Sequence, residues 1–221
     1  MKILIVYAHP EPSSFNAALR DMAVRTMESM GFEVRISDLY AMKFNPVASW
    51  SDFRNGHDLS SRQYGMIQRD AYLNDLLSND IKEEQSKLAW CDSVLLQFPL
   101  WWFGMPAILK GWLDRIFTAG FAFDKDKWFD SGLLKPRKVL VSVTTQSPES
   151  AYQESGIHGR MDQYLKPIHH TFRFAGISPL SPFIAYGVMN MDDQARRGVL
   201  QDYHDHLIRF LKKQVSINPD S

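Results

Sequence analysis

The sequence predicts an α/β protein built on a doubly wound, five-stranded parallel sheet with helices on both faces. Two observations lead to this fold class. Short runs that are continuously apolar, as in strands buried on both faces, alternate along the chain with longer segments of helical periodicity. The loops with the most unusual composition follow the ends of expected strands, where ligands bind in open α/β sheets.

The N-terminal part of the chain begins with an expected strand at residues 3–6, all of which are apolar. Residues 17–30 carry apolar side chains at helical spacing, and Gly31 ends this helix because glycine tolerates the left-handed conformation of a helix terminus. The second strand is expected at residues 32–36. Residues 40–68 are polar and rich in turn formers, so they are expected to be mostly irregular.

The central part repeats the strand–helix alternation. A helix is expected over residues 67–90, with a break near residues 79 and 80. The third strand follows at residues 94–96 and the next helix at residues 107–117. The fourth strand is expected at residues 139–143, again as a run suited to burial on both faces.

The C-terminal part completes the pattern. Residues 161–174 are helical in periodicity, and Pro167 marks a kink or a start within them. The fifth strand is expected at residues 183–186 and a closing helix at residues 192–213. Five strands with ligand loops at their carboxyl ends favour a flavodoxin-like order over a full dinucleotide-binding Rossmann domain, and neither G-x-G-x-x-G nor G-x-x-x-x-G-K-[ST] is present.

Length, charge and cysteine content narrow the class of protein. The 221 residues suit a single domain over residues 1–214 with a short tail at 215–221. Equal numbers of basic and acidic side chains, 25 of each, argue against nucleic acid or an anionic membrane as the main partner. Cys91 is the only cysteine, so no intrachain disulfide can form. With no signal peptide and no run of ~20 apolar residues, we expect a cytoplasmic protein without an integral membrane segment.

Residues 98–104, called the aromatic loop below, are the most informative stretch of the sequence. They carry Trp101, Trp102 and Phe103 in a row between an expected strand and an expected helix, where a polar loop is usual. These side chains could form a hydrophobic dimer surface or a wall for a flat ligand, and both can hold when a flavin site lies at a subunit interface. An isoalloxazine ring needs apolar contact and backbone N–H donors, which Trp102, Phe103 and Gly104 could supply.

The loop after the first strand, residues 9–16, is a candidate anion site. It ends in Ser13, Ser14 and Asn16 where the helix begins, and these residue types are common helix caps. The same loop could hold a phosphate, because free N–H groups and the helix dipole favour anions at a helix N-terminus. His9, at the end of the strand, could add a further donor.

The loop after the fourth strand contains Tyr152 and His158. A Tyr–His pair can donate a proton or stabilise a developing negative charge. Spacing alone nevertheless favours two unrelated surface residues. No Cys/His cluster has metal-ligand spacing, and the adjacent His169 and His170 would point about 100° apart on a helix, so no metal site is predicted.

Taken together, these segments resemble the NAD(P)H:quinone oxidoreductase family, the flavin enzymes that include DT-diaphorase. The resemblance covers roughly residues 2–212, and several separated motifs occur in the family's order. The matching segments are residues 9–16, 37–42, 44–46, 97–115, 144–145 and 156–159.

The resemblance implies FAD as the cofactor, with FMN as the less favoured choice, and NAD(P)H as co-substrate. It places Tyr152 and His158 at the pyrimidine edge of the flavin, as the catalytic pair. It assigns four residues to the phosphates, His9, Ser14, Phe15 and Asn16, and three to the adenine side, Gln63, Asp114 and Arg196. The residues that it assigns to the isoalloxazine surroundings are Pro99, Leu100, Trp102, Phe103, Thr144, Thr145 and Tyr152. We also expect Gly104 of the aromatic loop, and Gln146 and Ser147 of the loop after the fourth strand, to contact the cofactor. One departure falls inside the site: Gln146-Ser147 stands where the family has Gly-Gly.

The resulting prediction is a homodimeric, FAD-dependent enzyme that reduces quinones or similar small acceptors by two electrons. Nicotinamide and quinone would use one face of the flavin in turn, which predicts ping-pong kinetics. Three alternatives remain open at this point: an FMN-dependent azo- or nitroreductase, a one-electron carrier of flavodoxin type, and an ancillary subunit that regulates a membrane ion transporter.

Overall fold

The structure is a computed structural model that describes residues 1–54 and 63–215. Its sheet is parallel throughout, in the order β2-β1-β3-β4-β5, and β6 also pairs with β4. The strands are β1 (Lys2–Tyr7), β2 (Glu33–Asp38), β3 (Ser93–Pro99), β4 (Lys138–Thr144), β5 (Ser178–Pro179) and β6 (Phe183–Ala185). This order confirms the predicted flavodoxin-like class.

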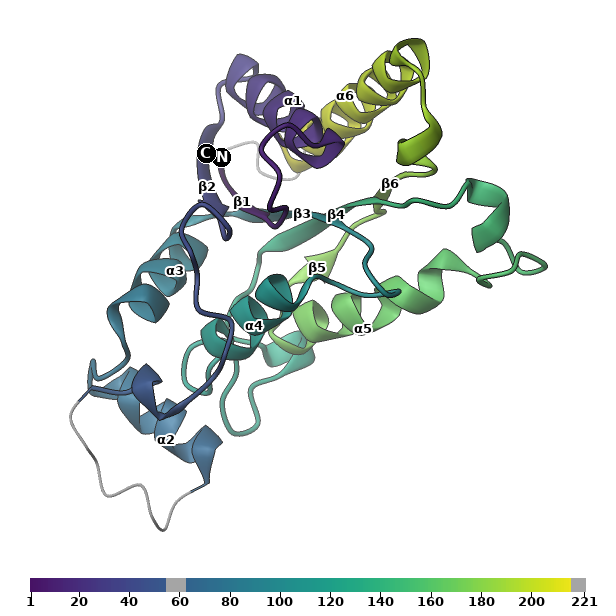
Figure 1. Ribbon diagram of the computed structural model, residues 1–221. Helices are drawn as coiled ribbons and strands as arrows, with labels where there is room; N and C mark the ends of the chain where they lie inside the picture. Colours follow the sequence, from purple (N-terminus) through teal and green to yellow (C-terminus); the bar gives the residue numbers. More distant parts are fainter. Residues whose placement is uncertain (55–62, 216–221) are drawn as a thin grey trace.

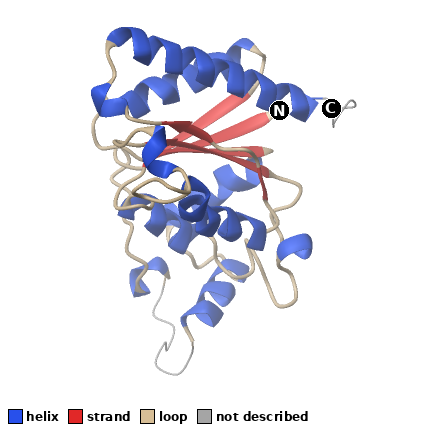
Figure 2. Cartoon of the chain, turned by 90° about the vertical axis from the view of Figure 1, so that its right-hand side faces the viewer, coloured by secondary structure: helices blue, strands red, loops and turns tan. Residues whose placement is uncertain are grey.

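Helices cover both faces of the sheet. In Figure 1, α1 and α6 lie above it, and α3, α4 and α5 lie below it, with α2 farther out on the lower side. The view in Figure 2 shows the sheet edge-on between these two helical layers. The helices are α1 (Phe15–Ser29), α2 (Tyr64–Leu73), α3 (Asn79–Trp90), α4 (Ala107–Ile116), α5 (Met161–Phe174) and α6 (Asp193–Val215).

The sheet has a hydrophobic core on each face, and successive side chains of β1 point alternately into the two cores. Leu4 and Val6 pack into the core beneath the sheet, whereas Ile3 and Ile5 pack into the core against α1 and α6. All four side chains are fully buried. At about 1.5–3 kcal/mol for each buried aliphatic side chain, this strand alone contributes substantially to stability.

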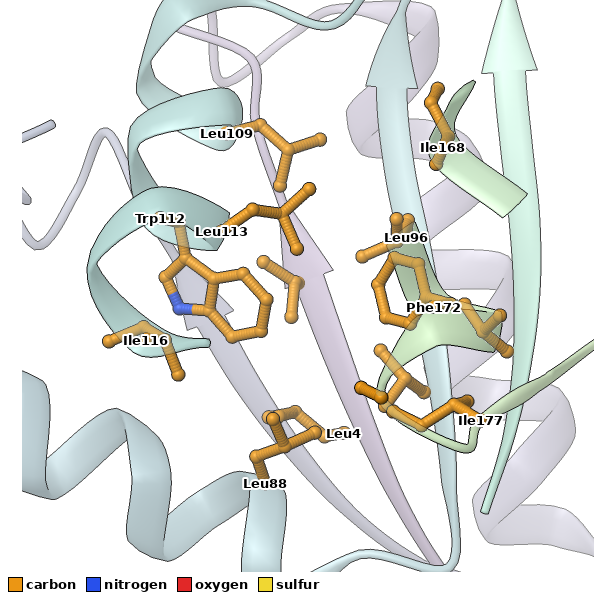
Figure 3. Close-up of a cluster of buried hydrophobic side chains, with 14 of the residues drawn as sticks. Leu4, Leu88, Leu96, Leu109, Trp112, Leu113, Ile116, Ile168, Phe172 and Ile177 are labelled. Atoms are coloured by element: carbon orange, nitrogen blue, oxygen red, sulfur yellow. The ribbon is translucent and has the colours of Figure 1, made fainter. Parts of the chain in front are cut away.

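Figure 3 shows how the lower core is assembled from distant parts of the chain. Trp112 from α4, Leu88 from α3 and Phe172 from α5 approach the β-strand residues Leu4 and Leu96, and all five are fully buried. Because the aromatic loop leads from β3 toward α4, this packing fixes the elements on both sides of that loop.

The edge strand differs from the sequence-based prediction. The predicted strand at 183–186 is present as β6, but β5 precedes it and pairs with the start of β4. Residues 180–182 separate the two pieces, and proline lies at Pro179 and Pro182. Proline cannot donate to a strand ladder, so an edge position with an interruption suits this sequence.

Helix boundaries also differ. The predicted break near residues 79 and 80 lies instead at residues 74–78, between α2 and α3, where Asp75 has a left-handed backbone with φ of 57°. The first helix begins at Phe15, because Ser14 caps it. Within residues 1–54 and 63–215, no helix is long and apolar enough to cross a membrane. The predicted tail lies outside the described residues, apart from Val215.

Candidate active site at the carboxyl edge of the sheet

The loop after β1 forms the start of α1 around Ser14. The Ser14 hydroxyl accepts a hydrogen bond from the Ala17 amide at 3.2 Å and lies 3.3 Å from the Tyr7 hydroxyl oxygen. The cap interpretation is therefore correct. The first-turn amides of Phe15 and Asn16 have no acceptor among the described residues, so the same turn also offers free N–H donors to an anion.

His9 is held in one tautomer beside this turn. Its Nδ1 accepts the Glu11 amide at 3.1 Å, and burial lowers the pKa of its imidazole. In the neutral ring, Nε2 therefore carries the proton. The ring centroid of His9 lies 5.9 Å from that of Trp101, so the loop after β1 meets the aromatic loop after β3.

Asn16 uses its side chain inside the protein. Its Nδ2 donates to the Thr144 Oγ1 at 2.7 Å, and its Oδ1 accepts from the Gln97 Nε2 at 2.8 Å. All three residues are buried. The side chain of Asn16 thus ties α1 to the ends of β3 and β4, and only its backbone amide is free to meet a ligand.

The aromatic loop closes in a two-residue turn. Trp101 and Gly104 exchange two backbone hydrogen bonds of 3.0 Å each, and the residues between them, Trp102 and Phe103, have φ of 49° and 62°. Two left-handed residues in sequence are typical of a type I′ turn, which normally uses Asn-Gly. Two large aromatic residues there indicate backbone strain, a feature that clusters at functional sites.

This turn presents its two aromatic side chains differently. The Trp102 side chain is 96% exposed. The Phe103 ring stacks on Tyr164 of α5 at a centroid distance of 5.2 Å and meets the His158 ring edge-on at the same distance. The backbone amides of Trp102 and Phe103 have no acceptor within the described part of the chain. The turn thus combines apolar surface with free N–H donors, as a flat heterocycle requires.

Tyr152 and His158 meet, contrary to what spacing alone favoured. Their ring centroids lie 5.0 Å apart. The loop between them folds back tightly, so that the His158 amide donates to the Ala151 carbonyl oxygen at 2.9 Å. Gly156 permits this fold, because a Cβ there would lie 2.4 Å from the Ser150 carbonyl oxygen.

These groups line a common cavity of about 560 Å³. Its walls come from the loops after β3 and β4: Leu100, Trp101, Trp102, Phe103, Gln146, Ser147, Tyr152 and His158. The His158 Nε2 lies 3.0 Å from the Ser147 Oγ. The cavity therefore brings together an aromatic wall and a set of proton donors.

Burial raises the pKa of the Tyr152 hydroxyl, while the nearby Ser147 and Thr145 side chains act in the opposite direction. Tyr152 consequently stays protonated at neutral pH and can donate a hydrogen bond. A phenol of this kind beside an imidazole can stabilise negative charge that develops on a bound ring.

Several predicted site residues shape the loops instead of exposing polar groups. Thr144 and Thr145 are buried, and the Thr145 Oγ1 donates to the Ser147 carbonyl oxygen at 2.7 Å. Pro99 ends β3 and is buried, whereas Gln146 is exposed at the rim of the cavity. Sequence reasoning missed Tyr164 and Tyr186, which pack against Phe103 and Tyr152. Their positions depend on how α5 and β6 dock, so no local pattern marks them.

The three residues assigned to the adenine side do not come together within one chain. Gln63 precedes α2, and Asp114 lies on α4, where it bonds to Lys110 at 2.5 Å. Both helices lie below the sheet in Figure 1, whereas Arg196 lies on α6 above it. The sheet separates Asp114 from Arg196.

The strand order and the ligand loops at the carboxyl edge define a flavodoxin-like protein. The family described as having a flavodoxin-like fold matches residues 1–207. Among curated proteins, the chain is 40% identical over 217 residues to ribosyldihydronicotinamide dehydrogenase [quinone] of Pongo abelii, covering 96% of this chain and 93% of that protein. It is 41% identical over 208 residues to NAD(P)H dehydrogenase [quinone] 1 of Cavia porcellus, covering 93% of this chain and 76% of that protein.

Among solved structures, a candidate quinone reductase from Klebsiella pneumoniae superposes with a TM-score of 0.89 at 33% identity, covering 95% of this chain and 85% of that chain. The chain belongs to the NAD(P)H:quinone oxidoreductase family. The family resemblance drawn from the separated sequence motifs is thereby confirmed.

Proposed function

We propose that this protein is an FAD-dependent enzyme that reduces quinones by two electrons at the expense of NAD(P)H, with ping-pong kinetics. Relatives named as quinone dehydrogenases, at about 40% identity across nearly the whole chain, support the reaction class. The observation that carries the proposal is the cavity in which the strained aromatic turn faces the Tyr152–His158 pair.

The described residues fit a flavin at two points. The free amides of Phe15 and Asn16, together with the proton on the Nε2 of His9, suit the phosphate groups. The aromatic turn suits the isoalloxazine, because Trp102 and Phe103 offer apolar surface next to unpaired amides. Leu100 lines the same cavity, and its amide bonds to the Thr144 carbonyl oxygen at the end of β4. Gly104 closes the turn through its two hydrogen bonds with Trp101, and Thr145 directly follows β4.

A bound flavin supplies hydride acceptance and donation, and the chain supplies position and charge stabilisation. Tyr152 would donate a hydrogen bond to the pyrimidine edge of the ring, and His158 would hold or deliver a proton there. Both groups are fixed by packing against Phe103, Tyr164 and Tyr186, so little reorganisation is needed when charge develops.

The proposed order of binding of the nicotinamide donor and the quinone acceptor rests on the same cavity. With a flavin ring on the aromatic wall, the open cavity of about 560 Å³ would leave one shared place for the nicotinamide or the quinone. Donor and quinone would therefore bind in turn, which gives the ping-pong order.

FAD rather than FMN is proposed because Gln63, Asp114 and Arg196 match positions on the adenine side in the family. Since the sheet separates Asp114 from Arg196 in one chain, the three could serve one nucleotide only if two copies contribute. This placement supports the homodimer that the resemblance implies. Cytoplasmic location stays a prediction from the sequence.

The first test is to purify the protein, record its visible spectrum and identify any released flavin by mass. We expect FAD at about one per chain, and a dimer by light scattering. FMN would contradict the adenine assignment and favour an azo- or nitroreductase, or a transporter subunit. Absence of flavin after reconstitution with FAD and with FMN would overturn the proposal.

A second test identifies the electron donor, because some relatives are named ribosyldihydronicotinamide dehydrogenases. Stopped-flow reduction of the flavin with NADH, NADPH and ribosyldihydronicotinamide, at matched concentrations, would rank the three donors. Reduction by NADH or NADPH supports the proposal. Reduction by ribosyldihydronicotinamide alone would replace NAD(P)H with the smaller donor.

A further inference from the structure

Ser147 occupies a position between the end of β4 and the His158 ring. Its hydroxyl oxygen lies 3.0 Å from the His158 Nε2, which is within hydrogen-bond distance, and both residues line the cavity of the candidate active site. This contact belongs to the Gln146-Ser147 pair, where the family has Gly-Gly. A glycine has no side chain with which to make it.

The Ser147 backbone is held firmly. Its carbonyl oxygen accepts from the Thr145 Oγ1 at 2.7 Å and from the Gly187 amide at 3.0 Å. Thr145 is buried at the end of β4, and its own amide bonds to the Ala185 carbonyl oxygen of β6 at 2.9 Å. The hydroxyl is therefore presented from a bend that hydrogen bonds tie to Thr145, next to β4, and to Gly187, which follows β6.

His158 is held by other groups, but none of them fixes its proton. Its amide donates to the Ala151 carbonyl oxygen, and its carbonyl oxygen accepts from the Tyr164 hydroxyl. Its ring packs against Phe103 and Tyr152. Among the described residues, the only hydrogen-bond partner of either ring nitrogen is the Ser147 hydroxyl.

The partner of one ring nitrogen determines which nitrogen carries the proton in a neutral imidazole. A serine hydroxyl has one donor and two acceptor positions, so it can engage Nε2 and keep an acceptor position for another group. Because the hydroxyl can donate to Nε2 or accept from it, the bond is compatible with either tautomer. Among the described residues, it is the one hydrogen bond that holds a ring nitrogen of His158 in place, beside the packing of the ring against Phe103 and Tyr152.

We propose that Ser147 is a positioning residue for His158, whose hydrogen bond to Nε2 fixes the orientation of the imidazole toward a ring bound in the cavity. The inference rests on the proposed function for its catalytic consequence. The hydrogen bond itself can be tested without any bound cofactor.

The first experiment uses ¹⁵N-histidine-labelled protein without ligand. Nitrogen-15 chemical shifts of His158, assigned by comparison with His158→Gln, report which ring nitrogen is protonated. We expect Ser147→Ala to change the His158 Nε2 shift, because this nitrogen loses its hydrogen bond, and Ser147→Thr, which keeps the hydroxyl, to leave the shift near the wild-type value. Ser150→Ala removes an exposed hydroxyl from the same loop and serves as the matched control.

The second experiment measures single-turnover reduction of the reconstituted flavoprotein by NADH. Ser147→Ala should slow reduction on the order of tenfold, less than the about 10²–10⁴-fold contribution of a general acid or base, and Ser147→Thr should recover most of the rate. Flavin content and thermal unfolding of each variant show whether folding is intact.

The two experiments separate the possible failures. Unchanged His158 shifts in folded Ser147→Ala would overturn the positioning role, whatever the enzyme does. Changed shifts with unchanged reduction would remove Ser147 from the reaction while leaving the proposed function standing. If the protein binds no flavin, the proposed function fails, and the nitrogen shifts still decide whether Ser147 fixes His158.

Discussion

The Asn16 side chain, in the first turn of α1, donates a 2.7 Å hydrogen bond to the Thr144 Oγ1 at the end of β4, 128 residues further along the chain. Its Oδ1 accepts from Gln97 on β3, and Gln97 accepts in turn from the Tyr203 hydroxyl of α6. This buried chain of hydrogen bonds joins the candidate phosphate loop to two strand ends whose loops line the cavity.

Asn16→Ala should therefore destabilise the fold. It would leave the polar groups of Gln97 and Thr144 without their partner in a buried setting, and each unsatisfied buried group costs about 1–3 kcal/mol. We expect a loss of about 2–4 kcal/mol in the free energy of unfolding, measured by urea denaturation. Asn190→Ala, at an exposed position, should stay within about 0.5 kcal/mol of wild type. Equal stability of the two variants would show that the buried network contributes little.

Removal of either member of the Tyr152–His158 pair should slow flavin reduction without releasing the flavin. Tyr152→Phe keeps the ring contacts with His158 and Tyr186 but removes the donor, so we expect a loss of about 10²-fold in the single-turnover rate. His158→Gln should act in the same direction. Stopped-flow absorbance on variants with full flavin content is the measurement, and wild-type rates in both would remove the pair from the mechanism.

Low pH should weaken the ion pairs that Arg115 forms with Asp52 and Asp80, and with them the stability of the fold. This guanidinium is buried and bonds to Asp52 at 2.9 Å and to Asp80 at 2.5 Å. Partial burial by itself raises the pKa of Asp80, but hydrogen bonds from Arg115 and Ser78 outweigh it and hold the pKa below its ordinary value. The stabilisation is thus fully present above the unfolded-state pKa of about 3.9 and is lost as pH falls through the lower folded-state value.

The variant Asp80→Asn tests whether the stabilisation by Asp80 is lost as pH falls. The variant should be less stable than wild type at pH 7. The difference in the free energy of unfolding should shrink as pH falls below about 4, because protonation of Asp80 in the wild type removes the same ion pair with Arg115 that the variant lacks. Urea unfolding from pH 7 down to the acid limit of reversible folding is the measurement. A gap that stays constant across that range would show that the ionisation of Asp80 is not coupled to folding.

The sequence predicted the main sheet and its helices because strands that are buried on both faces are continuous apolar runs, as at residues 3–6 and 139–141. The two-residue strand β5 escaped prediction because it is too short for a pattern and ends in proline. Likewise, the break between α2 and α3 depends on a left-handed Asp75, a conformation that residue type alone rarely predicts.

The candidate site was only partly predictable, because some of its contacts are local in sequence and others join distant segments. Ser14 lies where its residue type favours it, because capping is a local interaction. The approach of Tyr152 to His158 needs the tight loop around Gly156, and the contact of Ser147 with His158 needs β4 and β6 to be in register. Such non-local contacts leave no spacing signal, so for Tyr152 and His158 the family resemblance was more informative than the spacing.

The strained turn of the aromatic loop leads to a prediction in which stability and function move in opposite directions. Trp102 has φ of 49°, and its side chain is 96% exposed, so the folded protein gains almost no packing from it. Asparagine tolerates the left-handed conformation better. Trp102→Asn should therefore raise the free energy of unfolding by about 0.5–1 kcal/mol in the ligand-free protein.

The same substitution should weaken flavin binding, because an aromatic stacking partner worth about 0.5–1.5 kcal/mol is removed. We expect the flavin dissociation constant to rise up to about tenfold, measured by fluorescence titration of the apoprotein. Trp101→Asn is the matched control: Trp101 is half-exposed and does not share the left-handed backbone of its neighbour, so this change should not stabilise the protein. If Trp102→Asn lowered stability and left flavin affinity unchanged, the turn would be a structural feature rather than strain retained for ligand binding.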